Sequence, residues 1–318
     1  MNVLFKCDKS DSIGLGHFTR CKALAQSFKK KKIKCFFLGL KPGIIKNNKI
    51  SKISQKKDLE YTKKFIKYNK IQLVIKDNYS LGYNWEKKIS EKTFLTVIDD
   101  LKNSKHYCDI YINYHYNWFK KKHFKNLKKK NCKKLIGPKF TILQNFNIKK
   151  KMKFKKKTIF IYMGGADKNM FMYRLAKIFI NEKFKKFIKI FLLNNNHIKN
   201  KKLIKFLNKI DNKKIIKNKI RNFHQYLVSS DLSISPAGNT MIEQIALNTN
   251  NLIIGQNFQQ NQIANSLKKT GIINYSNNFK KINFNYIQQL LKKKSVQNKI
   301  INLQGKNLIL KKIFENFK

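Results

Sequence analysis

The 318-residue sequence predicts an α/β protein of two domains, each built from a parallel sheet with helices on both faces. A chain of this length can form two domains of about 150 residues, each with its own core. Short apolar runs alternate with lysine-rich helical patterns in both halves, as expected when strands and helices alternate. A run of lysines over 149–157 interrupts this pattern and predicts a linker, which places the domains at 1–150 and 151–318.

The apolar runs of both halves are short, which is typical of strands buried in a parallel sheet. In the first half we expect strands at 3–5, 35–38, 73–75, 96–98 and 109–112, with a helix at 17–29. In the second half a strand, a turn and a helix begin at 159–167, and further strands are expected at 189–193, 214–217, 232–235 and 252–254. We expect the tail, 297–318, to form a helix that crosses back to brace the first domain.

The formal net charge of +55 favours a nucleic-acid or membrane partner at first sight, because a cationic surface attracts phosphates. However, the arginines, which grip phosphate and bases bidentately, are only Arg20, Arg174 and Arg221 among 71 basic residues. The lysines are spread along the whole chain with many Asn, Ile and Phe residues, as expected from the codons of an AT-rich genome. We therefore interpret the charge as compositional drift and expect no specific nucleic-acid partner.

The cysteine pattern indicates free thiols in a reducing compartment rather than disulfides or a zinc site. No two cysteines form a Cys-x-x-Cys pair, and their number is odd; they are Cys7, Cys21, Cys35, Cys108 and Cys132. The sequence also contains no apolar stretch of the length that spans a membrane and no signal-peptide pattern. We expect a soluble, cytoplasmic protein without membrane insertion, present as a monomer.

The first strand runs into a turn with two glycines and a histidine. Gly14 and Gly16 allow a tight turn and close approach of the backbone to a ligand, and the helix N-terminus that follows favours an anionic group. His17 lies at the mouth of this turn, where an imidazole can accept a proton from water or a sugar hydroxyl at neutral pH. The alternative is a glycine-rich turn followed by an ordinary helix histidine.

Two turns of the second half have the character of a nucleotide site. Gly164 and Gly165 follow a strand, so that their backbone N–H groups can face a diphosphate. In the segment 233–244, Gly238 breaks the strand and Asn239 or Thr240 can cap the next helix. Glu243, one turn into that helix, is placed to accept both hydroxyls of a ribose. Alternatively, Glu243 completes a capping box with Thr240, three residues before it.

A third polar segment, 256–262, contains several amide side chains and precedes a helix. Amides such as Asn261 can hydrogen-bond sugar hydroxyls and N-acetyl groups. The segment is equally compatible with a loop that binds nothing.

In their order and spacing, these segments resemble the UDP-2,4-diacetamido-2,4,6-trideoxy-β-L-altropyranose hydrolase family of pseudaminic acid synthesis. That family is related to the spore-coat polysaccharide proteins and, more distantly, to the GT-B glycosyltransferase that makes lipid II. Two positions depart from the pattern: His115 stands where asparagine is expected, and Gln144 where arginine is common. The resemblance covers most of the chain and rests on residues 8–20, 76–79, 98–101, 108–109, 137–140, 163–167, 235–243 and 261–262.

The resemblance implies a GT-B-like fold, with two Rossmann-like domains and an active site in the cleft between them. It implies that the second domain holds UDP and that the first domain manages the hydrolytic water. His17 is then the base that activates water at C1, with inversion, and Tyr79 orients the water or the sugar. Asp99, Asp100 or Asp11 could orient the imidazole. No metal or other cofactor is expected, because helix N-termini can stabilise the charge of the departing diphosphate.

Three other functions remain as alternatives. A GT-B glycosyltransferase would use a similar nucleotide site, with His17 deprotonating an acceptor hydroxyl, but no segment suited to docking at a membrane is evident. A non-hydrolysing sugar 2-epimerase is a second enzyme candidate. A non-specific, basic nucleic-acid-binding protein is the candidate from another class, and the scarcity of arginine argues against it.

Overall fold

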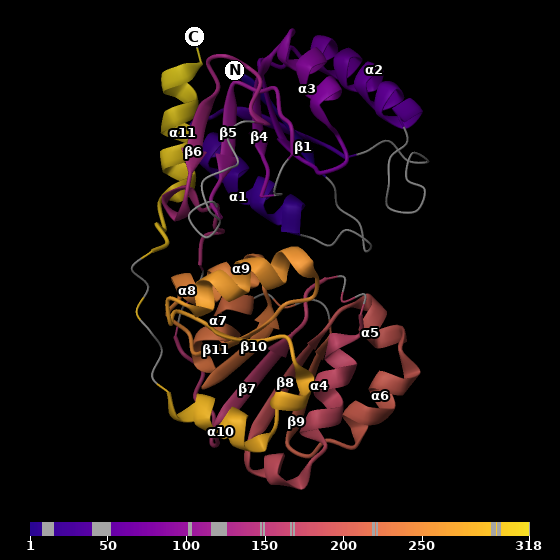
Figure 1. Cartoon of the computed structure of the whole chain (residues 1–318), viewed down its shortest axis with the longest axis vertical. Coiled ribbons are helices and arrows are strands. Elements are labelled where there is room, and N and C mark those ends of the chain that lie inside the picture. The colour runs from indigo at the N-terminus through magenta and orange to yellow at the C-terminus, as the bar shows by residue number, and fades with distance from the viewer. Residues whose placement is uncertain are drawn as a thin grey trace. The chain divides into compact units, whose positions relative to one another are not determined.

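The chain forms two compact units, each containing a six-stranded sheet (Figure 1). The first unit comprises Met1–Asn145 and the segment from Asn302 onward, and the second comprises Phe146–Ile301. The computed structural model describes residues 1–7, 16–39, 52–100, 104–115, 126–146, 148, 150–165, 167, 169–217, 220, 222–293, 297 and 300–317.

In the first unit the strands pair in the order β2-β1-β3-β4-β5-β6, and all neighbouring strands are parallel. The order reverses beside β1, since β2 and β3 lie on its two sides, and ligands of such sheets bind beyond the carboxyl ends of the strands at the reversal. The strands are β1 (Asn2–Cys7), β2 (Lys34–Leu38), β3 (Leu73–Asp77), β4 (Phe94–Ile98), β5 (Ile110–Asn113) and β6 (Lys133–Ile136). The helices are α1 (Gly16–Lys30), α2 (Lys52–Tyr68), α3 (Tyr83–Ser90), α11 (Gly305–Asn316) and the 3-10 helix η3 (Pro138–Phe140).

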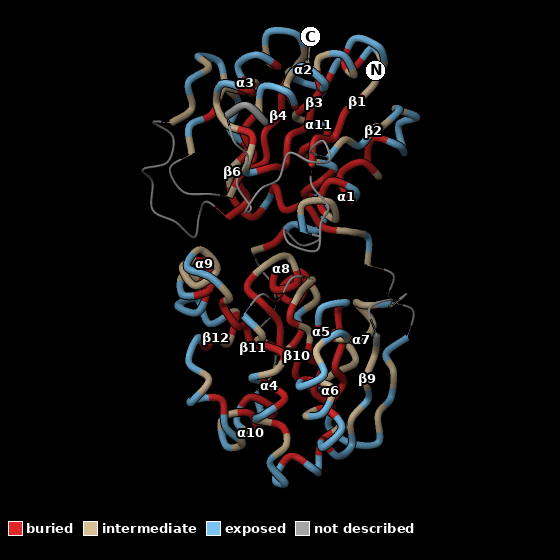
Figure 2. The backbone as a smooth tube through the Cα atoms, turned by 90° about the vertical axis from the view of Figure 1, so that its right-hand side faces the viewer, coloured by how far each residue is buried: buried red, intermediate tan, exposed pale blue. Residues whose placement is uncertain are grey.

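Different helices cover the two faces of this sheet, because side chains alternate along each strand. Val3 and Phe5 of β1, with Ile75 of β3, pack in one core with α1 and α11. Leu4 and Val74 point to the opposite face and pack with α2 and α3. Figure 2 shows β1 and β3 buried along almost their whole length, in agreement with this two-sided cover. The last residues of each strand therefore also point to alternate faces.

A buried ion pair lies inside the first unit. The Lys6 ammonium of β1 donates to Asp58 of α2 at 2.7 Å, and both side chains are almost fully buried. Asp58 also accepts a hydrogen bond from the indole of Trp85 at 3.0 Å, so the carboxylate is well satisfied. The pair ties α2 to the sheet.

The second unit repeats this architecture, with strand order β12-β11-β10-β7-β8-β9 and parallel pairing throughout. Ile159 and Ile161 of β7 pack with α4, α6 and α10, whereas Phe160 faces α7. The strands are β7 (Thr158–Tyr162), β8 (Ile188–Leu193), β9 (Lys213–Lys217), β10 (Leu232–Pro236), β11 (Asn251–Ile254) and β12 (Asn274–Ser276). The helices are α4 (Phe171–Phe179), α5 (Asn195–Lys199), α6 (Lys201–Asn208), α7 (Phe223–Ser229), α8 (Asn239–Ala246), α9 (Phe258–Lys268), α10 (Phe284–Lys292) and the 3-10 helices η4 (Glu182–Lys186) and η5 (Phe279–Lys281).

The predicted α/β class is confirmed, and every strand expected from the apolar runs is present within a residue or two of its predicted bounds. Two edge strands, β6 and β12, were not predicted. β6 has the sequence KKLI and β12 the sequence NYS, so neither contains the apolar run that marks a buried strand. None of the helices that the structure describes has the length and apolar character needed to cross a lipid bilayer.

The C-terminal tail crosses back to the first unit, as expected from the sequence. Ile309 and Ile313 of α11 are fully buried in the core beside α1, where α11 lies in Figure 1. The Lys306 ammonium donates to the carbonyl of Leu143 at 3.1 Å, and the Ser27 hydroxyl of α1 donates to Asn307 at 3.0 Å. The predicted second domain of 151–318 must therefore be corrected, because the apolar stripe of α11 is covered by the first sheet and not by the second.

Gly305 begins α11 at a point of close backbone contact, and its replacement tests the docking of the tail. A Cβ atom on Gly305 would lie 2.3 Å from the carbonyl oxygen of Thr141 and 2.8 Å from its nitrogen, so the backbone itself would have to move. We expect Gly305→Ala to destabilise the first unit by about 1–3 kcal/mol, measured by urea unfolding. An unchanged unfolding midpoint would show that α11 docks in another way.

Candidate functional site

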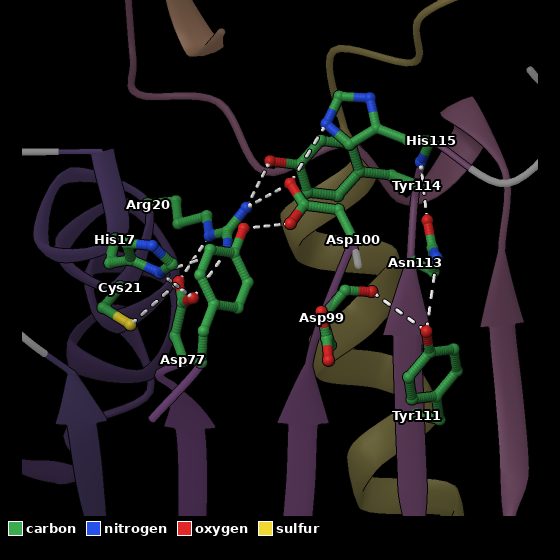
Figure 3. A network of polar contacts seen from close by, with 11 residues as sticks. His17, Arg20, Cys21, Asp77, Asp99, Asp100, Tyr111, Asn113, Tyr114 and His115 are labelled. Atoms are coloured by element: carbon green, nitrogen blue, oxygen red, sulfur yellow. Dashed lines mark hydrogen bonds and ion pairs between the residues drawn. The ribbon is translucent and has the colours of Figure 1, made fainter. Parts of the chain in front are cut away.

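Charged and aromatic side chains gather where β3, β4 and β5 of the first unit end (Figure 3). Asp77 is the last residue of β3, and Asp99 and Asp100 directly follow β4. His17 and Arg20 lie in the first turns of α1, which begins after β1, the neighbour of β3 in the sheet. Because the strands are parallel, their carboxyl ends and the start of α1 meet at one edge.

Asp77 is the centre of this cluster. Its carboxylate is fully buried and lies 2.5 Å from Nδ1 of His17 and 2.6 Å from Nη2 of Arg20, whose Nε also donates to it. Burial alone would raise the pKa of Asp77, but the charge of Arg20 and the contact with His17 hold it well below its usual range. Asp77 is therefore ionised at neutral pH.

The ionised state of Asp77 assigns the tautomer of His17. A carboxylate can only accept hydrogen bonds, so the His17 nitrogen beside it, Nδ1, must carry a hydrogen. In the neutral ring the basic lone pair is then on Nε2, and no described residue forms a hydrogen bond with that atom. The ring is 11% exposed, so it is held firmly but remains open to a small reactant. This is the geometry of a general base with an orienting carboxylate.

Tyr79 lies directly beside His17. The two rings meet edge to face with centroids 4.5 Å apart, and the Tyr79 side chain is 42% exposed. Its hydroxyl donates to Asp100, so the lone pairs of the phenol oxygen remain for a water molecule or a sugar hydroxyl. Burial would raise the pKa of Asp100, but the nearby charge of Arg20 lowers it, and this carboxylate also stays ionised.

A second histidine, His115, lies next to Asp100 at 3.5 Å. Burial, helped by the charge of Arg20, lowers the pKa of His115 to about 4, although Asp100 opposes the change. His115 is therefore neutral at pH 7. The Arg20 guanidinium also donates at 3.0 Å to the hydroxyl of Tyr114, which directly follows β5.

The structure thus brings His17 and Tyr79 together, as expected, but the carboxylate beside His17 is Asp77. Asp100 contacts Tyr79 instead, and Asp99 faces the other side of the sheet, so neither orients the imidazole. Gly16 is the first residue of α1, and Gly14 and Asp11 lie outside the described residues. Asp77 lies in the segment 76–79, which carries part of the resemblance. Its role depends on the pairing of β3 with β1, which the sequence alone does not reveal.

In the second unit, the turn after β7 contains the paired glycines. Gly164 has φ +77°, a left-handed conformation that favours glycine, and its carbonyl accepts a hydrogen bond from Asn194 at 3.0 Å. Asp167 accepts from the backbone N–H groups of Phe171 and Met172 at the start of α4 and lies 2.7 Å from His197. The side chain of Asp167 is therefore used to hold the turn.

The start of α8 differs from the prediction. The N-cap residue is Gly238, and Asn239 and Thr240 are already helical, so neither caps the helix. The capping box of Thr240 with Glu243 is therefore wrong, because it requires Thr240 at the N-cap. Gly238 has no side chain that could cap the helix. The buried Gln244 ties α8 to β10, because its side-chain oxygen accepts a hydrogen bond from the Ser235 hydroxyl at 2.5 Å.

Glu243 is 7% exposed and lies beside His224 of α7. Its carboxylate lies 3.4 Å from Nε2 of His224, whose ring meets Phe146 at a centroid distance of 4.7 Å. Burial and the charge of Glu243 raise the pKa of Tyr162 to about 12. Because Thr240 is not the N-cap residue, helix capping does not explain why position 243 carries a carboxylate.

The third polar segment is helical from Phe258 onward, so the alternative of a simple loop is wrong for most of it. Asn257 caps α9 by accepting from the N–H of Gln260 at 2.9 Å. Asn261 accepts from the Tyr275 hydroxyl at 2.8 Å and packs closely on Gly255. Its part in ligand binding stays a prediction.

Within the described residues, no group of three His, Cys, Asp or Glu side chains is arranged to hold a metal ion. The described cysteines are free thiols.

The comparison with curated proteins supports the resemblance expected from the motifs. Over 174 residues the chain is 29% identical to the UDP-2,4-diacetamido-2,4,6-trideoxy-beta-L-altropyranose hydrolase of Campylobacter jejuni. The match covers 52% of this chain and 61% of that relative. No family model matches the chain.

Solved structures agree with the fold over the whole chain. MurG of Acinetobacter baumannii superimposes with a TM-score of 0.66, at 12% identity, over 99% of both chains. The spinosyn rhamnosyltransferase SpnG complexed with thymidine diphosphate has a TM-score of 0.61, at 9% identity, over 100% of this chain and 96% of its own. A UDP-GlcNAc 2-epimerase of Methanocaldococcus jannaschii has a TM-score of 0.62, at 12% identity, over 99% of this chain and 100% of its own. The chain therefore has the two-domain, Rossmann-like α/β fold of GT-B glycosyltransferases and sugar epimerases, and about half of it resembles a UDP-sugar hydrolase in sequence.

Proposed function

We propose that this protein is a UDP-sugar hydrolase that releases UDP by attack of water at C1, with inversion. The substrate class is a UDP-linked diacetamido-trideoxy sugar of the kind used in pseudaminic acid synthesis. The observation that carries the proposal is the pair formed by His17 and the ionised, buried Asp77 at the end of β3. The sequence likeness to a hydrolase of this class is its second support.

His17 is the general base in this proposal. Nε2 takes a proton from the attacking water, and the imidazolium that forms is stabilised by Asp77 at Nδ1. Arg20 keeps Asp77 ionised, so the carboxylate does not take the proton itself. Tyr79 forms one wall beside the imidazole, and its phenol oxygen can accept a hydrogen bond from the same water or from the sugar.

The bond changes are those of a single displacement. The water oxygen bonds to C1 while the bond from C1 to the UDP oxygen breaks, and UDP leaves with the electron pair. The diphosphate is already a good leaving group, so stabilisation of its charge is enough, and helix N-termini can supply it.

UDP is assigned to the second unit. The diphosphate is assigned to the turn at Gly164 and Gly165 and to the N-terminus of α8, where Asn239 and Thr240 follow the N-cap Gly238 and the helix dipole favours an anion. The backbone N–H of Gly238 itself donates to the Pro236 carbonyl at 2.8 Å. Glu243 accepts the ribose hydroxyls, and Asn261 offers its amide N–H groups to the ligand, since its carbonyl oxygen is used by Tyr275.

One experiment tests the reaction class. The purified protein is incubated with UDP-linked N-acetylated sugars in ¹⁸O-labelled water. A hydrolase gives free UDP and free sugar labelled at C1, whereas a glycosyltransferase needs an added acceptor and an epimerase gives an altered UDP-sugar. Absence of free UDP with every substrate of the class would refute the proposal.

We expect His17→Ala and His17→Asn to lower turnover by about 10²–10⁴-fold, because a general base contributes this much. UDP binding should be nearly unchanged, since the nucleotide is assigned to the second unit. Turnover within a few-fold of the wild type would remove His17 from the mechanism.

We expect Asp77→Asn to lower kcat by about 10²-fold or more, because an amide can donate to Nδ1 and favour the tautomer with its hydrogen on Nε2. The matched control is Asp58→Asn, which removes another buried carboxylate of the same unit without touching His17. Both variants should unfold more easily, and only Asp77→Asn should lose turnover. An equal loss of turnover in both would argue against the tautomer role.

We expect Glu243→Ala to weaken UDP binding by about 1.5–3 kcal/mol, because the ribose hydroxyls lose a charged hydrogen-bond acceptor. Calorimetric titration with UDP and with its 2′,3′-dideoxy analogue measures this. The variant and the wild type should bind the analogue about equally. Unchanged affinity for UDP would assign Glu243 a structural role instead.

A further inference from the structure

Four buried charged side chains form a second network on the face of the first sheet opposite to His17. The Lys76 ammonium of β3 donates to Glu86 of α3 at 2.7 Å. Glu86 lies 2.9 Å from Nδ1 of His106, and Nε2 of His106 lies 2.8 Å from the carboxylate of Asp99. All four residues are at most 3% exposed. We call these four residues the tetrad.

The geometry assigns the charge of His106. Nδ1 of His106 hydrogen-bonds Glu86, and Nε2 lies 2.8 Å from the Asp99 carboxylate in an ion-pair contact that does not have hydrogen-bond geometry. Two carboxylates so close to one buried ring favour its doubly protonated, charged form. Both nitrogens therefore carry hydrogen, and the tetrad consists of two cations and two anions. Burial alone would lower the pKa of His106, but Asp99 and Glu86 raise it to about 9. Lys76 lowers the pKa of Glu86 against the effect of burial.

The other titratable groups near His106 are a tyrosine and two cysteines. The ring of Tyr111 on β5 lies with its centroid 5.2 Å from that of His106, and burial raises the pKa of this phenol well above its usual value. Burial also raises the pKa of the Cys108 thiol, which lies 3.8 Å from that of Cys132. The hydrogen bond with Cys108 lowers the pKa of Cys132, and His106 is a minor contributor to that shift.

The tetrad and the candidate site share two strand ends. Lys76 directly precedes Asp77, and Asp99 directly precedes Asp100, so each pair of neighbours points to opposite faces of the sheet. On one face Asp77 and Asp100 contact Arg20. On the other face Lys76 and Asp99 are joined through Glu86 and His106, and Glu86 also accepts from the backbone N–H of Tyr107 at 2.9 Å. The tetrad therefore clamps the two strand ends that carry the site.

We propose that His106 is a positioning residue for the reaction, which holds Asp99 and thereby sets Asp100 and the Tyr79 hydroxyl in place beside His17. This inference rests on the proposed hydrolase function for its kinetic test. In this proposal His106 does not touch the substrate and acts only through Asp99. The charge of His106 is fully present below neutral pH and is lost as the pH rises through about 9, so turnover should fall in that range.

The kinetic test compares His106→Gln, which removes the charge, with Asp58→Asn, which removes a buried ion pair elsewhere in the same unit. We expect His106→Gln to lower kcat at pH 7.5 by about tenfold or more, with KM changed less than threefold. The fall of wild-type kcat near pH 9 should be absent in this variant. Asp58→Asn should lower the unfolding midpoint and keep both kcat and the pH profile. Loss of stability in His106→Gln with wild-type kcat and profile would overturn the proposal.

A second measurement needs neither substrate nor a folded variant. In ¹⁵N-labelled wild-type protein, NMR of the imidazole nitrogens should show His106 doubly protonated up to about pH 9. The ring signals of His17 should shift as His106 titrates. A neutral His106 at pH 7, or His17 signals unmoved by its titration, would overturn the proposal. If these NMR results are obtained but no UDP-sugar is hydrolysed, the proposed function is refuted, while the coupling of the tetrad to His17 is confirmed.

Discussion

The ion pair of Asp77 with Arg20 is the interaction on which the candidate site depends. A fully buried carboxylate is costly unless it is paired, and Arg20 satisfies both of its oxygens. The same pair orients the His17 ring and connects α1 to the end of β3. Loss of either partner would leave an uncompensated charge in the protein interior, so stability and the proposed chemistry are coupled at this point.

The alternation of side chains along a strand explains why the backbone that carries the site is held from both faces of the sheet. A parallel strand covered on both sides must point consecutive side chains into two different layers. At the ends of β3 and β4 this places one charge of each neighbouring pair among the residues of α1 and the other beside α3. The two layers thus hold the same short stretch of backbone from opposite sides, which restricts its movement more than either network alone.

Much of the fold could be predicted from the sequence, because its signals are local. Apolar runs predicted the interior strands. The motifs also predicted His17 and Tyr79 as residues of one site, and their rings are in contact. The role of Asp77 could not be predicted, since it depends on strand order, and the cap at Gly238 could not, since several residues nearby are good caps. Weakly apolar edge strands also gave no signal. The nucleotide contacts of Glu243 and Asn261 stay predictions, as does the absence of a specific nucleic-acid partner.

The position of α11 has a consequence for the synthesis of the protein on the ribosome. The hydrogen bond from Ser27 to Asn307 joins residues 280 positions apart, whereas the second unit is one continuous segment. At about 5–20 residues per second, roughly 15–55 s pass between the synthesis of α1 and that of α11. During this time the face of the first sheet that α11 covers stays open to solvent and to chaperones. The second unit, although made later, is therefore the first whose chain is complete.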